Sequence, residues 1–93
     1  MIRARKGAEQ ALRNALLEVA EHVRLNETGT IGFHIAQDRG DPGVFTTCER
    51  FADRAAMDRH NGSDVVARLF AIARPIQDGG VVQVTRTEIS VKD

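Results

Sequence analysis

The sequence predicts an α+β fold with the element order βαββαβ, in which helices cover one face of an antiparallel sheet. Two runs of alternating apolar residues, at about 30–37 and 44–51, predict neighbouring strands, and the Gly-, Asp- and Pro-rich segment between them predicts a hairpin turn. Apolar residues spaced by three and four on either side of this hairpin predict helices. This is the split βαβ, or ferredoxin-like, arrangement, and residues 1–93 are enough for a single domain and too few for two.

The first part of the chain is expected to contain a short strand and a long helix. Residues 1–6 form the strand, with Ile2 and Ala4 on the same face. Polar and apolar positions in residues 8–25 separate onto two sides of a helix, which predicts an amphipathic helix packed on the sheet.

The last part is expected to contain a helix broken in two and a final strand. Asp53 is a suitable N-cap for a short helix that runs to about His60. Ser63 is a second N-cap, for a helix that ends before Pro75. Residues 81–89 favour a strand with an apolar first half and a more polar second half.

Period-two alternation divides the side chains of the two central strands between the faces of the sheet. One face takes Ile31, Phe33, Ile35, Phe45, Thr47, Glu49 and Phe51. The other face takes His34, Cys48 and Arg50 with small or polar neighbours. Neither face is purely polar, so we expect helices to cover the first face and a second copy of the chain, in a homodimer, to cover the other.

Charge and composition exclude several classes of function. Thirteen basic and thirteen acidic residues cancel, so the chain lacks the positive field that attracts nucleic acid. No apolar run approaches the roughly 18 residues of a membrane span. The single cysteine, Cys48, excludes an internal disulfide, and the basic start of the chain has no apolar segment after it, so a cytoplasmic location is expected.

Four segments occur in a characteristic order. They are Gly32-Phe33-His34-Ile35, the Asp-Pro-Gly turn at 41–43, Phe45-Thr46-Thr47-Cys48-Glu49-Arg50-Phe51, and Ala55-Ala56-Met57-Asp58-Arg59-His60 followed by Ser63. Together they resemble the antibiotic biosynthesis monooxygenase (ABM) domain family. Members of this family have an aromatic residue on the second strand, a third strand ending in Glu-Arg-aromatic, and a helix ending in His shortly before Ser.

The resemblance implies a dimeric α+β barrel, in which two ferredoxin-like subunits pack sheet to sheet and each has a small-molecule pocket between sheet and helices. Family members of known activity oxidise quinol-like or polyketide aromatics with dioxygen without metal or flavin, so no cofactor is expected. By position, Glu49 matches the strand-three Glu and His60 the helix-terminal His. Phe33 matches the strand-two aromatic, and Phe51 stands where the family usually has Trp.

The chain departs from the family pattern at several points. It has no Trp and no Tyr, so the phenol and indole groups with which some relatives position substrate are absent. The His that many members have just after the Ser is replaced by Val65, and the third helix contains no His. The usual haem ligand is therefore missing, which argues against haem degradation. The first strand is shorter than usual, so either a polar site residue is lacking or the true start lies upstream.

Glu49 and His60 are the candidate catalytic residues. Burial beside Phe45 and Phe51 would raise the pKa of the Glu49 carboxyl and let it accept a proton from a phenol or a ketone; the alternative is a salt bridge to an Arg. His60 exchanges protons near neutral pH, or instead interacts with the carbonyls at the end of its helix.

The remaining titratable residues are assigned structural roles. His34 is expected at the interface with the second copy, and His22 in solvent on the charged side of the first helix. Cys48 is expected to be a small buried apolar residue. Because Cys48 and Glu49 point to opposite faces of the sheet, no metal site is expected.

Two functions follow from these expectations. The first is a cofactor-independent monooxygenase acting on a small aromatic or quinol-like substrate, with Glu49 or His60 accepting the proton and with Phe33, Phe51 and Phe70 shaping the pocket. The alternative is a non-catalytic dimeric barrel that binds a hydrophobic small molecule in a stress-related or unknown role.

Overall fold

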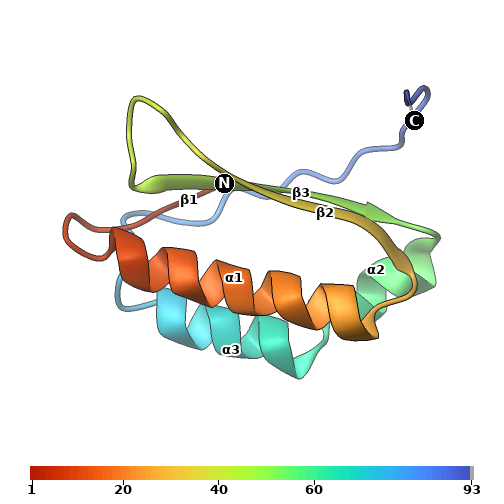
Figure 1. Ribbon diagram of the computed structural model, residues 1–93, viewed down its shortest axis with the longest axis horizontal. Helices are drawn as coiled ribbons and strands as arrows, with labels where there is room; N and C mark the ends of the chain where they lie inside the picture. Colours follow the sequence, from red (N-terminus) through yellow and green to blue (C-terminus); the bar gives the residue numbers. More distant parts are fainter. Residues whose placement is uncertain (93) are drawn as a thin grey trace.

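The computed structural model describes residues 1–92, which form three helices and a three-stranded antiparallel sheet. The elements are β1 (Ile2–Arg3), α1 (Glu9–Asn26), β2 (Thr30–Gln37), β3 (Val44–Phe51), α2 (Arg54–Asn61) and α3 (Asp64–Ala73), and the strand order is β1-β3-β2. Figure 1 shows two layers, with the sheet on one side, α1 and α3 side by side on the other, and α2 near one end of the sheet. The α+β class, the ferredoxin-like arrangement and the broken second helix are therefore confirmed.

The pairing of β2 with β3 determines which side chains face the helices. Phe33 lies opposite Glu49, and this pair shares the helix-facing side of the sheet. His34 lies opposite Cys48 on the other side, where both residues are exposed. The predicted division of faces is confirmed, but the expected burial of Cys48 is wrong, because no described element covers that side of the sheet.

The start of β2 is irregular at Ile31. The register between β2 and β3 shifts between Thr30 and Gly32, so β2 has an extra residue at this point. The Ile31 side chain borders the same cavity as the half-buried Phe33, but it is 57% exposed. A shift of one residue depends on the partner strand and leaves no signal in the alternation of β2 itself.

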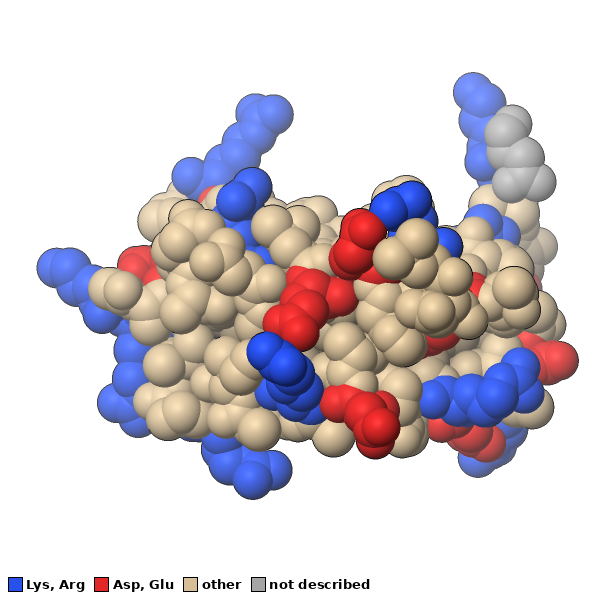
Figure 2. Space-filling view, turned by 60° about the horizontal axis from the view of Figure 1, so that its bottom comes forward, with Lys and Arg blue, Asp and Glu red and all other residues tan. Residues whose placement is uncertain are grey.

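The core forms where α1 packs against the sheet and α3. The buried side of α1 consists of Leu12, Ala15, Leu16, Val19 and Val23, as the helical spacing predicts. Leu12 and Leu16 pack with Phe45 of β3, whereas Val19 and Val23 pack with Val66 of α3. Charged residues occupy the outer side of α1, and Figure 2 shows acidic and basic side chains on the surface of this side of the molecule. None of the helices within residues 1–92 is long and apolar enough to cross a lipid bilayer.

Side-chain caps fix the starts of α2 and α3. The Asp53 carboxylate accepts a hydrogen bond from Ala56 N at 2.8 Å. The Ser63 hydroxyl accepts one from Val66 N at 3.4 Å. Both predicted N-caps are confirmed, and the break between the two helices lets α2 cover the end of the sheet.

The predicted last strand, residues 81–89, is not formed. Residues 76–82 instead run along the free edge of β1, where Val82 N donates to Met1 O at 3.0 Å and Met1 N donates to Val82 O at 2.8 Å. Because β1 has only two residues, it offers few backbone partners, and residues 83–92 are exposed and form no strand. Strand propensity alone does not form a strand without a neighbour to pair with.

Replacement of Leu12 tests the core. Leu12 is 0% exposed, so Leu12→Ala should lower the free energy of unfolding by about 2–5 kcal/mol through lost burial and the cavity left behind. Leu17→Ala on the same helix is the matched control, because Leu17 is 45% exposed and its loss should cost less than about 0.5 kcal/mol. Equal destabilisation of the two variants in urea unfolding would contradict this packing.

Candidate active site

The helix-facing side of the sheet borders a cavity of about 940 Å³. All four phenylalanines of the chain line it, namely Phe33 from β2, Phe45 and Phe51 from β3, and Phe70 from α3. Leu16 and Val19 of α1 add further apolar surface, and residues 81–88 of the C-terminal segment border the cavity as well. The cavity therefore has the size and the apolar walls that suit a small aromatic molecule.

The structure brings the three predicted substrate-binding phenylalanines to this one cavity. Phe33 and Phe51 also pack on the ring of His60, with centroid distances of 5.7 and 5.4 Å. Phe70 is half-buried and packs with the Val19 cluster between α1 and α3. Phe45 and the C-terminal segment are lining elements that the sequence analysis did not assign to the pocket.

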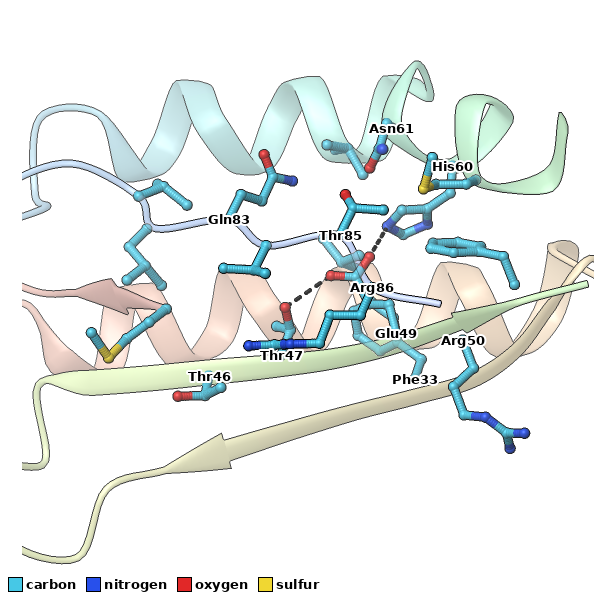
Figure 3. A pocket seen from close by; sticks show the side chains of 18 of the residues that line it. Phe33, Thr46, Thr47, Glu49, Arg50, His60, Asn61, Gln83, Thr85 and Arg86 are labelled. Atoms are coloured by element: carbon cyan, nitrogen blue, oxygen red, sulfur yellow. Dashed lines mark hydrogen bonds and ion pairs between the residues drawn. The ribbon is translucent and has the colours of Figure 1, made fainter. Parts of the chain in front are cut away.

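His60 and Glu49, the two candidate catalytic residues, contact each other at the cavity wall. His60 lies at the end of α2 and is 4% exposed. Its Nε2 is 3.0 Å from Glu49 Oε1, and Glu49 Oε2 accepts a hydrogen bond from Thr47 Oγ1 at 2.8 Å. Figure 3 shows Glu49 reaching from β3 towards His60 with Thr47 beside it.

A second carboxylate contacts the other nitrogen of the His60 ring. His60 Nδ1 donates to Glu27 Oε1 at 2.7 Å, and Thr30 Oγ1 donates to the same oxygen at 2.7 Å. Glu27 follows α1 directly and is 33 residues from His60 in the chain. No sequence pattern pointed to Glu27, because a lone Glu in a polar connection is ordinary and its partner lies on a distant element.

Gly29 allows the connection after α1 to approach α2 closely. A Cβ at this position would lie 2.7 Å from Ala56 Cβ and 3.2 Å from an Arg59 guanidinium nitrogen. Any side chain there would push apart the segment that contains Glu27 and the helix that contains His60. The absence of a side chain at this position therefore supports the contact between the two residues.

Hydrogen bonding sets the charges of His60 and Glu49. The bond from His60 lowers the pKa of the Glu49 carboxyl below its ordinary value, against the opposing effect of burial and with further help from Thr47. The bond to Glu49 raises the pKa of His60, again against burial, and the bond to Glu27 adds to the rise. The predicted rise in the Glu49 pKa is wrong, because this charge-assisted bond outweighs desolvation.

His60 and His22 make contacts that the sequence analysis did not expect. Both ring nitrogens of His60 contact carboxylates, so the alternative contact with the carbonyls at the helix end is not made. The His22 side chain is 35% exposed, and its Nε2 lies 3.4 Å from Glu27 Oε2. His22 was expected to lie free in solvent on α1, and this contact corrects that expectation.

The acidic and basic groups of the site are arranged for proton exchange. Within residues 1–92, no three His, Cys, Asp or Glu side chains are grouped so as to hold a metal ion. Glu27 and Glu49 contact opposite nitrogens of the same ring, so their oxygens do not converge on one point. The chemistry that this geometry offers is proton uptake and release beside an apolar cavity.

Comparison with known proteins identifies the family. Residues 1–71 match the family model described as antibiotic biosynthesis monooxygenase. The chain belongs to this family. Family membership confirms the resemblance seen in the sequence.

Solved structures share the ABM fold along most of the chain. A Pseudomonas aeruginosa protein is 26% identical over 94% of this chain and 88% of its own, with a TM-score of 0.79. A Shewanella oneidensis protein is 26% identical over 84% and 76%, with a TM-score of 0.78. An antibiotic biosynthesis monooxygenase is 27% identical over 94% and 93%, with a TM-score of 0.78. No curated protein matches the chain significantly.

The His60–Glu49 pair predicts how stability depends on pH. His60 has a raised pKa, so its contribution is fully present below its ordinary value of 6.5 and is lost as the pH rises through the folded pKa. Glu49 has a lowered pKa, so its contribution is present above 4.5 and is lost as the pH falls through the folded pKa. The free energy of unfolding that this pair supplies should therefore be highest between 4.5 and 6.5.

Urea unfolding of wild type and His60→Gln across the pH range measures this contribution. The difference between the two proteins should be largest in that window and should shrink at both ends. Glu18→Gln is the control, because this carboxylate lies on the outer side of α1 and is 46% exposed. A difference between wild type and His60→Gln that does not vary with pH would refute the ion pair.

Proposed function

We propose that this ABM domain oxygenates a small, electron-rich aromatic or quinol-like molecule with dioxygen, without metal or flavin. The observation that supports this proposal most directly is the His60–Glu49 pair at the wall of a cavity lined by four phenylalanines. The apolar walls bind a flat ring, and the pair lies where it can take up a proton from that ring's substituents. Phe33, Phe51 and Phe70 are the proposed substrate-binding residues.

Glu49 and His60 are the proposed proton acceptors. Glu27 and Glu49 flank one imidazole, so the cluster keeps a net negative charge when His60 is protonated and has room for one more proton. Deprotonation breaks an O–H bond of a phenol, or a C–H bond next to a carbonyl, and places the proton on this cluster. The electron pair of the broken bond stays on the substrate as an electron-rich anion.

The substrate anion then reduces dioxygen itself. A C–O bond forms between a ring carbon and dioxygen, which becomes a substrate-bound peroxide and takes up a proton. Loss of water breaks the O–O bond and the C–H bond at that carbon and leaves a carbonyl group. The substrate and one dioxygen thus give a quinone-type product and one water, and the substrate supplies all the electrons.

We infer that the protein works as a homodimer in the cytoplasm. No described helix covers the side of the sheet opposite α1 and α3; Glu88 contacts Arg50 there, and Ala36, Thr46 and Cys48 are exposed on it. These side chains are small and uncharged, which suits the close packing of a second sheet. The free thiol of Cys48 suits a reducing compartment.

Oxygen consumption tests the proposed reaction. With a panel of hydroquinones and naphthols, the wild-type protein should consume oxygen, and Glu49→Gln or His60→Ala should lower kcat by about a hundred- to ten-thousand-fold, because the proton acceptor is lost. Glu18→Gln is the matched control, since this carboxylate lies on the outer side of α1 and is 46% exposed. It should leave kcat unchanged.

Other outcomes of the same panel decide between functions. Thermal stabilisation by these compounds without oxygen uptake or product would reject the monooxygenase and favour a protein that only binds a hydrophobic molecule. No oxygen uptake and no stabilisation would reject both functions for this class of compound.

Light scattering tests the dimer. One chain has a mass of 10.2 kDa, and at micromolar concentration the wild-type protein should have twice this mass. Cys48→Asp should shift it towards the monomer, because a buried unpaired carboxylate is costly in a sheet-to-sheet interface. Cys48→Ser is the control of similar size and should remain dimeric. A wild-type monomer would rule out the dimer.

A further inference from the structure

His60 separates the main cavity from a second, smaller one of about 230 Å³. The second cavity is lined by the end of α1, the start of β2 and part of α2, including His22, Glu27 and Arg59. Among residues 1–92, His60 alone lines both cavities. Glu49 contacts the ring from the main cavity, and Glu27 contacts it from the second.

Only one oxygen of the Glu27 carboxylate is hydrogen-bonded to a described residue. Oε1 accepts the hydrogen bonds from His60 and Thr30. Oε2 is buried and has no hydrogen-bond partner among the described residues. A buried carboxylate oxygen is costly without a partner, so this atom favours a visiting water or a proton from the second cavity.

His22 continues the contacts from Glu27 to solvent. Its Nε2 lies 3.4 Å from Oε2 of Glu27, an ion-pair contact without a hydrogen bond, and its side chain is 35% exposed. Its Nδ1 lies 3.4 Å from the amide nitrogen of Asn26, on the outer side of α1. The series Glu49, His60, Glu27 and His22 is therefore joined by contacts of 3.0, 2.7 and 3.4 Å.

We propose that this series is a proton path between the main cavity and solvent, with Glu27 and His22 as its outer members. The path serves the proposed oxygenation and rests on it for its purpose. A bound aromatic molecule displaces water from Glu49, so a proton taken from the substrate has no exit on that side. The second cavity provides an exit that stays open while the main cavity is occupied.

The movement of the proton follows from the two nitrogens of the imidazole. When Glu49 takes up the substrate proton, the protonated His60 ring keeps its proton on Nε2 and releases the one on Nδ1 to Glu27, which passes it to His22 or to water in the second cavity. When the peroxide later loses water, a proton moves along the path in the opposite direction, from the second cavity to the main cavity, and becomes part of that water. No bond other than those to hydrogen is made or broken along the path, and the proton count is unchanged after each turnover.

Positive groups lie near both ends of the path. Arg59 of α2 lines the second cavity, and Arg86 of the C-terminal segment lines the main cavity (Figure 3). The amino group of Met1 also helps to lower the pKa of Glu49. This charge favours the ionised form of Glu49, which keeps it available as a proton acceptor.

NMR of protein labelled with ¹⁵N-histidine tests the path without turnover. The exchange of the His60 Nδ1 proton with water should slow by about tenfold or more in His22→Phe, which keeps a ring but removes the proton-transferring nitrogen. In His22→Ala the exchange should become dependent on added imidazole, which fits the space left at the second cavity. Glu27→Gln should slow the exchange and also lower the pKa of His60.

Glu21→Gln is the matched control, because Glu21 is an exposed carboxylate on α1 paired with Arg24. It should leave the exchange at His60 unchanged. Wild-type exchange in His22→Phe would overturn the path even if Glu27→Gln fails to fold, because His60 would then reach water by another route. Slowed exchange in a protein that consumes no oxygen would support the path and reject the oxygenation.

Discussion

The structure depends on one buried imidazole held between two carboxylates. His60 is 4% exposed, and a protonated ring at that depth is tolerated only with its counter-charges in contact. This requirement fixes the relation of three elements, because β3 presents Glu49, the connection after α1 presents Glu27, and α2 presents His60. The Asp53 cap and the missing side chain at Gly29 are the local features that let these segments meet.

The hydrogen bond from His60 stabilises the Glu49 carboxylate and lowers its pKa, so Glu49 by itself is a weaker base than an ordinary carboxylate. In the proposed reaction the accepting group is therefore the whole cluster, whose proton affinity belongs to Glu27, His60 and Glu49 together. A cluster with net negative charge beside phenylalanine side chains gains from taking up a proton, because burial penalises the charge that remains. Entry of an apolar substrate removes water and strengthens this effect.

Structure that depends on residues close together in the chain was predictable from the sequence. Structure that depends on contacts between residues far apart in the chain was not. Helical spacing identified the buried side of α1, and alternation placed Phe33 and Glu49 on the same side of the sheet. The contact between Glu27 and His60 and the register shift at Ile31 depend on segments far apart in the chain. The Glu49 pKa moved in the opposite direction to the prediction for the same reason, because burial is visible in the strand pattern and the hydrogen-bond donor from α2 is not.

The position of β2 at the outside of the sheet has a consequence for how the chain avoids aggregation. From Thr30 to Gln37 this strand contains no Lys, Arg, Asp, Glu or Pro, the residues that usually prevent an outer strand from pairing with another molecule. The register shift at Ile31 interrupts the regular row of backbone groups near the start of the strand. The register shift at the start of β2 therefore gives this otherwise unguarded edge a protection that charge does not provide.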